Sequence, residues 1–175
     1  AEMGEGSSDG GVVPIPGWKV TGNLTSVRYG AFGGFIQPTD PGPANRGRNY
    51  FVGGPDSPSS TANQQITNSG NAADIDAGRL NFTVTGYFGG FDGQDDRASL
   101  SVTFRDVDGN NLKSISIGNV NSSDRNGNNG LQGRTLTDTV PVRTRSVLFV
   151  LTMQRLVGPY NDAAADSMTF VLSQR

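Results

Sequence analysis

Apolar and polar residues alternate along several stretches of the chain. Residues 80–88, 98–105 and 168–172 carry an apolar side chain at nearly every second position. Successive side chains of a β-strand point to opposite faces, so this period of two predicts strands with one buried face. With shorter and more polar runs added, the predicted strands are 18–21, 24–29, 48–52, 60–67, 80–88, 98–105, 111–117, 135–141, 146–152 and 168–172.

The inward-facing positions of these strands predict the core. The stretch 146–152 is apolar on both faces, so it should be a central strand that is covered on each side. The residues expected between the sheets are Phe82, Val84, Leu100, Val102, Phe104, Val147, Phe149, Leu151, Phe170 and Leu172.

Turn-forming residues separate the predicted strands. Gly22-Asn23 and Asp108-Gly109 are hairpin-turn signals. Residues 1–17, 30–47 and 118–133 are rich in Gly, Pro, Ser or Asn, and we expect them to be loops.

The charged residues argue against helix. Asp outnumbers Glu by 14 to 2, and Arg outnumbers Lys by 12 to 2. Because Glu and Lys favour helices whereas Asp favours turns, we expect negligible helix. The chain is therefore predicted to be all-β, a single domain over residues 1–175 in which two antiparallel sheets pack as a β-sandwich (jelly roll).

Composition and charge exclude several functions. The net charge is −2 and the largest basic cluster is the pair Arg46 and Arg48, so no nucleic-acid partner is expected. The longest apolar run, near 147–151, is too short for a transmembrane segment. The chain has no Cys and no His, which excludes thiol nucleophiles, zinc sites of Cys/His type and His-based triads. We therefore do not expect an enzyme.

Three short motifs occur in order along the chain. They are Ile-Pro-Gly-Trp at 15–18, Arg-Asn-Tyr-Phe-Val-Gly-Gly-Pro at 48–55 and Ala-Asp-Ser-Met at 165–168. Together they resemble galactose-binding-like jelly-roll domains and are similar to secreted carbohydrate-binding modules. This resemblance implies a secreted, cell-surface or periplasmic domain that binds carbohydrate without catalysis. The alternative is a structural or assembly subunit of a periplasmic or cell-surface complex, whose partner would be a neighbouring protein subunit.

The same resemblance implies a structural Ca²⁺ ion between the start of the chain and the last strand. Glu2 and Asp166 would be its side-chain ligands, and backbone carbonyls of residues 50–54 would complete the shell, since Ca²⁺ prefers oxygen ligands. The alternative is that Glu2 belongs to a disordered terminus and Asp166 caps a turn. A jelly roll usually pairs its first and last strands. The expected first strand would lie before Ala1, where it is missing or replaced and where a leader could have been removed.

The candidate ligand-binding residues are expected on loops. Phe91 and Tyr160 offer aromatic faces for a sugar ring, and Arg155, Asn161 and Asp162 offer polar groups for its hydroxyls. Concave sites that combine apolar faces with a few polar anchors are typical of small-ligand recognition. These five residues form the predicted ligand site.

Other candidates have structural interpretations. Trp18, the only Trp, starts a strand and is expected in the core rather than as a sugar platform. Phe32 and Phe35 lie in a Gly-rich loop and fit either a sugar surface or an anchor for a neighbouring subunit.

An acidic cluster could suggest a glycosidase pair, but no second separated pair accompanies it. The cluster is interpreted as turn chemistry combined with Arg pairing. Its members are Asp92, Asp95 and Asp96, beside Arg97, with Arg125 or Arg155 as further partners.

Overall fold

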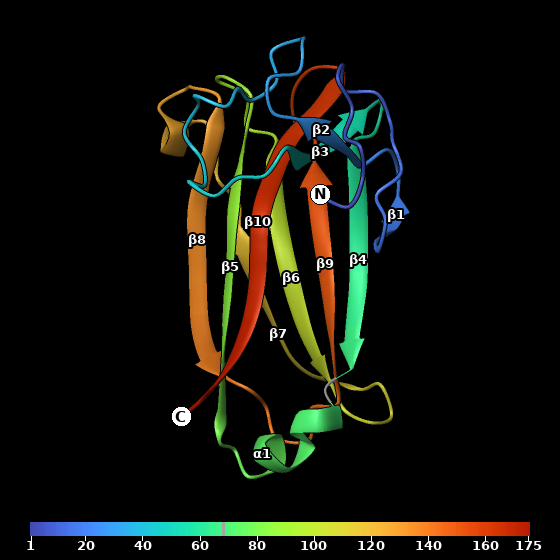
Figure 1. Ribbon diagram of the computed structural model, residues 1–175, viewed down its shortest axis with the longest axis vertical. Coiled ribbons are helices and arrows are strands. Elements are labelled where there is room, and N and C mark those ends of the chain that lie inside the picture. The colour runs from blue at the N-terminus through green and yellow to red at the C-terminus, as the bar shows by residue number, and fades with distance from the viewer. Residues whose placement is uncertain (68) are drawn as a thin grey trace.

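The computed structural model describes residues 1–67 and 69–175, and in this part of the chain two antiparallel sheets of five strands each face one another (Figure 1). The β9 sheet has the strand order β1 (Lys19–Thr21), β4 (Ser59–Thr67), β9 (Ser146–Gln154), β6 (Arg97–Arg105) and β7 (Asn111–Gly118). The β10 sheet has the strand order β2 (Thr25–Arg28), β3 (Asn49–Pro55), β10 (Tyr160–Gln174), β5 (Leu80–Gly90) and β8 (Gly130–Thr139). The predicted two-sheet antiparallel β-sandwich is confirmed.

The core fills the space between the two sheets. Buried and half-buried residues alternate along β5 and β6, as the period of two predicts. Eight of the ten predicted core residues are buried, but Phe170 and Leu172 are only half-buried. They lie on the part of β10 that has β5 on one edge and, among the described residues, no strand on the other. Their core prediction therefore needs correction, because one flank of the sandwich is open beside them.

β9 lies at the centre of its sheet, between β4 and β6, as predicted. Only one of its faces is fully covered, however. Val147 and Phe149 are buried on the inner face, whereas Leu148 and Val150 are half-exposed on the outer face. The expectation of cover on each side is wrong, because the second sheet covers the inner face alone.

Short helical segments depart from the expectation of loops. η1 (Ser69–Asn71) and α1 (Ala72–Asp76) lie at the lower end in Figure 1, where Ile75 anchors α1 in the core. The predicted loop 118–133 contains η2 (Ser123–Arg125) and the start of β8. Within the described residues, no helix has the length and apolar character needed to span a membrane.

β10 begins eight residues earlier than the predicted strand at 168–172. Ala163, Ala164 and Ala165 are all buried, so this half of the strand has no alternation of apolar and polar residues. The strand also changes register between Asn161 and Ala164 and again between Asp166 and Thr169. Continuous burial and irregular pairing hid this half of β10 from a search for a period of two.

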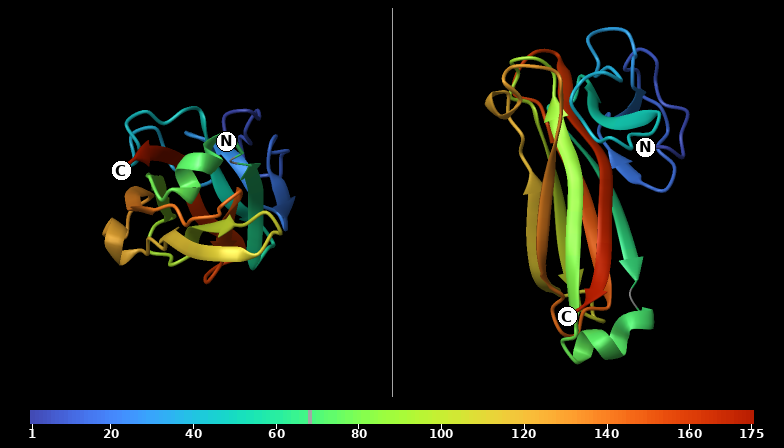
Figure 2. Two further views of the ribbon diagram at one scale, coloured as in Figure 1. Left: turned by 90° about the horizontal axis from the view of Figure 1, so that it is seen from below. Right: turned by 60° about the vertical axis from the view of Figure 1, so that its left-hand side comes forward.

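The early half of β10 is buried on both faces because residues 29–47 fold over the outer face of its sheet. In Figure 2 (right) this segment stands beside the upper part of the sandwich. The Tyr50 hydroxyl accepts a hydrogen bond from the Ile36 N–H at 2.9 Å, and the Arg46 guanidinium lies 5.1 Å from the centre of the Tyr29 ring. The second apolar cluster under this cover consists of Val27, Ala31, Ile36, Tyr50, Val52, Leu131 and Ala164.

Candidate functional site

A groove with mostly polar walls lies at the upper end of the sandwich, where three loops meet. These loops are 29–47, 91–96 and 119–129, which follow β2, β5 and β7. One aromatic ring lies there among carboxylate and amide side chains. The residues that line this groove, called the polar groove below, are Asp40, Pro41, Phe91, Asp92, Gly127, Asn128 and Asn129.

Arg125 holds two of these loops together from beneath the groove. The residue is only 5% exposed, and its guanidinium donates hydrogen bonds to backbone carbonyls. Nη1 donates to Gly90 at 3.1 Å, to Asp92 at 3.0 Å and to Asn128, and Nη2 donates to Gln94 at 2.8 Å. Burial lowers the pKa of Arg125, and the negative charges of nearby aspartates oppose that shift. The guanidinium therefore provides donors to four backbone carbonyls, and the bond to Gly90 is fully buried.

Asn129 joins its own loop, 119–129, to both of the other loops at the surface. Its Oδ1 accepts the Asp92 N–H at 2.7 Å, and its Nδ2 donates to the Gly34 carbonyl at 2.9 Å. Asp92 has a φ of 43°, a left-handed conformation that a residue with a side chain seldom adopts. The hydrogen bonds of Asn129 and Arg125 stabilise it there. The groove walls are thus fixed by the protein's own contacts.

Phe91 and Asp162 are the two predicted ligand residues that the structure brings together. Both line a small pocket beneath the polar groove, together with Gly34 and Phe35, and Phe91 lines the groove above as well. Burial, and secondarily the negative charge of Asp96, raises the pKa of Asp162 to about 6. Asp162 thus lines the small pocket together with Phe91 but is not part of the polar groove lining.

Asn161 does not belong to a ligand-binding surface in this structure. Its side chain is fully buried, and its amide donates to the carbonyls of Ser57 at 3.3 Å and Met153 at 3.2 Å. These hydrogen bonds join the start of β10 to Ser57 and to β9. Asn161 is thus corrected from ligand residue to fold residue, because both of its donors already have backbone partners.

Tyr160 and Arg155 also lie away from the polar groove. The Tyr160 hydroxyl donates to the Gly10 carbonyl at 2.8 Å, and its ring meets Phe35 edge-on at 5.5 Å. Arg155 Nη1 donates to the Pro159 carbonyl at 2.6 Å. Both side chains are half-exposed, but neither lines the polar groove.

The acidic cluster separates into three environments. Asp92 is exposed and lines the polar groove, whereas Asp95 accepts the N–H and the hydroxyl of Ser122 at 2.9 and 2.7 Å. Asp96 is fully buried and accepts three backbone N–H groups. Those donors belong to Leu156, Val157 and Asp162, at 2.6, 2.9 and 2.9 Å. The interpretation as turn chemistry fits, but backbone and Ser groups take the place of the expected Arg partners.

Glu2 and Asp166 are brought to one cavity, which Ala1 and Asn45 also line. Both Glu2 oxygens accept backbone N–H groups, from Arg48 at 2.9 Å and Asn49 at 2.8 Å. In Asp166, Oδ2 accepts the Tyr29 hydroxyl at 2.7 Å and Oδ1 accepts the Ser167 N–H at 2.6 Å. Together, the two carboxylates accept hydrogen bonds from the Tyr29 hydroxyl and from the backbone of Arg48, Asn49 and Ser167.

These two carboxylates fit the oxygen chemistry of Ca²⁺. Burial raises the pKa of Asp166, whereas the hydrogen bonds from Tyr29 and Ser167 and the positive charge of the Ala1 ammonium oppose the shift; the negative charge of Glu2 adds least. No cluster of three or more His, Cys, Asp or Glu residues suited to a metal occurs within residues 1–67 and 69–175. Carbonyl oxygens would therefore have to supply most of the shell. Those of residues 50–54 lie in β3, which pairs with β2 and β10 on its two edges.

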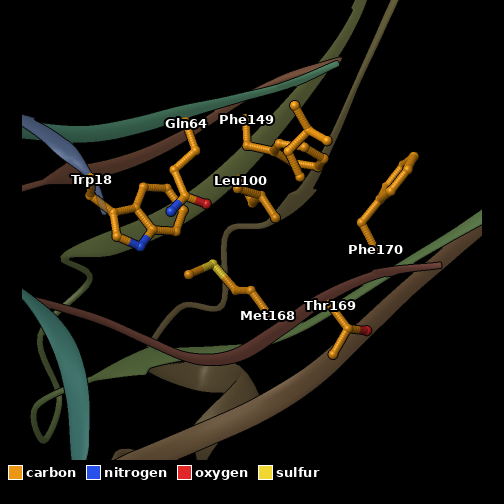
Figure 3. A pocket seen from close by; sticks show the side chains of 8 residues that line it. Trp18, Gln64, Leu100, Phe149, Met168, Thr169 and Phe170 are labelled. Atoms are coloured by element: carbon orange, nitrogen blue, oxygen red, sulfur yellow. The ribbon is translucent and has the colours of Figure 1, made fainter. Parts of the chain in front are cut away.

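A second groove is apolar and lies on the flank between the sheets, with a volume of about 160 Å³. Figure 3 shows Trp18 and Gln64 on one side of it and Met168, Thr169 and Phe170 on the other. Trp18 packs against Phe51 with ring centres 5.6 Å apart, and it is half-buried at the rim of the core. The full lining of this apolar groove is Trp18, Gln64, Ile66, Leu100, Phe149, Met168, Thr169 and Phe170.

Sequence reasoning missed most of the polar groove. Asp40, Asn128 and Asn129 lie in Asn-, Gly- and Pro-rich loops that resemble ordinary turns in sequence. Arg125 is the residue that the sequence could have pointed to, because an Arg amid Asn, Ser and Gly residues suggests a side chain that binds backbone carbonyls. Only the fold brings these loops together.

No protein-family model matches the chain, and no curated protein matches its sequence. Among solved structures, the enzymatically active domain of tailspike protein 4 from bacteriophage CBA120 matches with a TM-score of 0.57 and 18% identity. This match covers 95% of the present chain but only 21% of the tailspike chain.

A second similar structure is a family 16 carbohydrate-binding module, with a TM-score of 0.50 and 14% identity over 73% of this chain and 79% of that chain. A third is the CBM22-1 xylan-binding domain of Xyn10C from Paenibacillus barcinonensis, with a TM-score of 0.45 and 14% identity over 95% of this chain and 91% of that one. At such identities the likeness concerns the fold. The chain has the β-sandwich jelly-roll fold of carbohydrate-binding modules.

Proposed function

We propose that this domain binds carbohydrate in the polar groove and acts as a non-catalytic, extracytoplasmic binding module. The observation that carries the proposal is the placement of the Phe91 ring among Asp40, Asp92, Asn128 and Asn129. A sugar has an apolar face of C–H groups and a rim of hydroxyls. The ring would stack on the face, and the carboxylates and amides would bind the hydroxyls.

The rigidity of the groove supports the same function. Arg125 and Asn129 fix the two loops that flank Phe91, so little ordering would remain to be done when a ligand binds. Preorganised walls increase affinity by lowering this cost. The fold likeness to a carbohydrate-binding module agrees with the proposal, although the fold alone does not assign a ligand.

The non-catalytic part of the proposal rests on where the carboxylates lie and which groups they bind. Asp40 Oδ2 accepts the Gln37 N–H at 2.8 Å, and Asp96 is enclosed by three backbone donors. Asp162, which has the raised pKa expected of a general acid, lies in the pocket beneath the groove. We therefore expect binding without hydrolysis.

The test is a screen of the purified domain on an immobilised glycan array, followed by incubation with the bound glycans and an assay for new reducing ends. Binding without new reducing ends supports the proposal. Release of sugar would assign an enzymatic role instead. Absence of binding to every glycan class would contradict the carbohydrate function.

One observation favours the alternative, a structural or assembly subunit. Phe32 is 87% exposed in loop 29–47, and an exposed aromatic ring on a loop can anchor a neighbouring subunit. If the domain assembles, Phe32→Asp should disrupt a complex that purifies with the wild type. Glycan binding should survive this substitution under our first proposal.

We also propose one structural Ca²⁺ ion held by Glu2 and Asp166. Support comes from the shared cavity, from the burial of Asp166 and from the oxygen chemistry of the two carboxylates. The ion would tie the start of the chain to β10. A calcium-rich, extracytoplasmic setting would suit such a site.

A further inference from the structure

Asp162 carries a half-buried carboxyl group without a partner. Its backbone N–H donates to Asp96 at 2.9 Å, but within residues 1–67 and 69–175 its side chain forms no hydrogen bond and no ion pair. The pocket that it lines beneath the polar groove has a volume of about 10 Å³, which is room for about one water molecule. An ionised carboxylate accepts about four hydrogen bonds, so the closed pocket favours the protonated form.

Ionisation of Asp162 is the change of charge that the pocket has to accommodate near neutral pH. Burial, and secondarily the negative charge of Asp96, raises the pKa of Asp162 to about 6. Burial also raises the pKa of Tyr50 and of Tyr160, so these hydroxyls stay protonated in this range. The titratable and charged groups around the carboxyl group are Asp96 and Arg125 beside Gly90, Tyr50 from β3, Tyr160 from β10, and Asp40 and Asp92 from the groove above.

Gly34 joins this pocket to the polar groove. A Cβ atom added to Gly34 would lie only 2.6 Å from the Phe91 ring, so its backbone packs directly against that ring. The Gly34 carbonyl accepts the Asn129 amide at 2.9 Å, and Asn129 in turn accepts the Asp92 N–H at 2.7 Å. Other walls of the pocket are residues of β3, β5 and β10, which are held in the sheet: Tyr50, Val52, Gly90 and Ala164. A pocket that needs more space for water therefore opens on the Gly34 side.

We propose that Asp162 is a positioning residue for the polar groove. While its carboxyl group is protonated, the pocket stays closed and Gly34 holds the ring of Phe91 in place. When the group ionises, water enters the pocket, Gly34 moves away, and Phe91 and Asn129 lose their fixed positions. The groove therefore binds its ligand more tightly in mildly acidic than in neutral solution. This link to the ligand rests on the proposed carbohydrate function, whereas the opening of the pocket does not.

The test compares the amide hydrogen exchange rates of Asp92 and Asn110 in the protein without ligand. The Asp92 N–H is bonded to Asn129, and the Asn110 N–H is bonded to Asp106 at 2.9 Å in the turn between β6 and β7, at the lower end in Figure 1. The ratio of the two rates cancels the general rise of exchange with pH. We expect this ratio to increase about fivefold in the wild type between about pH 5 and about pH 7. Asp162→Asn has nearly the same shape but cannot ionise, so its ratio should stay constant.

Asp56→Asn is the matched control and should keep the wild-type increase. Asp56 is exposed, does not line the pocket, and has a φ of 53°, which Asn also adopts readily. A constant wild-type ratio, or the same increase in Asp162→Asn, would overturn the proposal.

Affinity for the glycan with the strongest array signal tests the link to the ligand. The wild type should lose about fivefold in affinity over the same pH range, and Asp162→Asn should lose none. A response in exchange without a change in affinity would overturn this link. If no glycan binds at all, the carbohydrate function is contradicted, and the exchange ratios alone decide the role of Asp162.

Discussion

The polar groove and the apolar groove are both concave, but they leave different groups available to a ligand. In the polar groove, Arg125 and Asn129 satisfy loop carbonyls and N–H groups, so side chains remain for binding. In the apolar groove, the side chains are hydrocarbon and the backbone edges of β4 and β10 have no ladder partner in residues 1–67 and 69–175.

This difference separates a polar surface from an opening in the core. A hydroxyl-rich molecule needs directed polar side chains and one flat ring, which the polar groove offers. The flank offers apolar side chains that belong to the core between the sheets. The predictions below test how far this division holds, beginning with the largest expected effect.

The inner wall of the apolar groove should be essential for folding, and its rim should not. Phe149 is 6% exposed, so Phe149→Ala should lower the free energy of unfolding by about 3–5 kcal/mol. Ile66 lies across the groove but is 48% exposed, so Ile66→Ala should cost less than about 1 kcal/mol. Urea denaturation measures both. Equal losses would mean that the groove is not the open side of the core.

Removal of Arg125 should loosen the polar groove. Arg125→Ala leaves several buried carbonyls without donors, and we expect a loss of about 3 kcal/mol in the free energy of unfolding. Arg134→Ala is the control, because Arg134 forms an exposed ion pair with Asp124 at 3.3 Å and should contribute less than about 1 kcal/mol. Denaturation curves for the two variants distinguish the cases. Similar stability for both would show that the Arg125 contacts do not hold the loops.

Calcium should stabilise the cavity that Glu2 and Asp166 line. An ion that binds only the folded state adds about 2.7 kcal/mol at one hundred times its dissociation constant. EDTA should therefore lower Tm, and millimolar Ca²⁺ should restore it. Asp166→Ala should abolish the response, whereas Asp138→Ala, at an exposed ion pair with Lys113, should keep it. Identical melting temperatures of the wild type in EDTA and in Ca²⁺ would contradict the proposed calcium site.

The pocket beneath the polar groove should respond to pH. The pKa of Asp162 is about 6 in the folded protein, above the ordinary value of 3.8, so the folded state holds this proton more tightly than the unfolded state. Its contribution to stability is present below about pH 4 and is lost as the pH rises through about 6, with a total of about 2 kcal/mol after solvent screening of this partly exposed carboxyl group is discounted. Asp162→Asn should flatten this part of the stability profile. A wild-type profile that rises with pH over the same range, unchanged in the variant, would contradict the burial of this carboxylate.

The regular half of the fold follows directly from the sequence. Leu80, Phe82 and Val84 alternate with polar residues because β5 has the core on one face only. The same argument places β6, and the turn at Asp108-Gly109 joins it to β7. The short-range pattern of apolar, polar and turn-forming residues determines these strands.

The remaining half depends on contacts between distant segments. The early part of β10 has no alternation, because the Ala163 to Ala165 run is covered on both faces by elements far away in sequence. α1 forms where Ile75 reaches the core. The sequence predicts Phe91 as a ligand residue from its type and its place in a loop. Its groove partners Asp40 and Asn128 were not, since only the packing of three loops brings them to it.

The most direct test of the carbohydrate proposal is a calorimetric titration with the glycan that gives the strongest array signal. Wild-type protein, Phe91→Ala and Phe32→Ala are compared at the same concentration. Phe91 lines the polar groove, whereas Phe32 is an 87% exposed Phe on another loop and serves as the matched control. We predict that Phe91→Ala weakens binding by about tenfold or more, since a stacked ring contributes about 1.4 kcal/mol, and that Phe32→Ala binds like the wild type. Full affinity in Phe91→Ala would contradict the central claim.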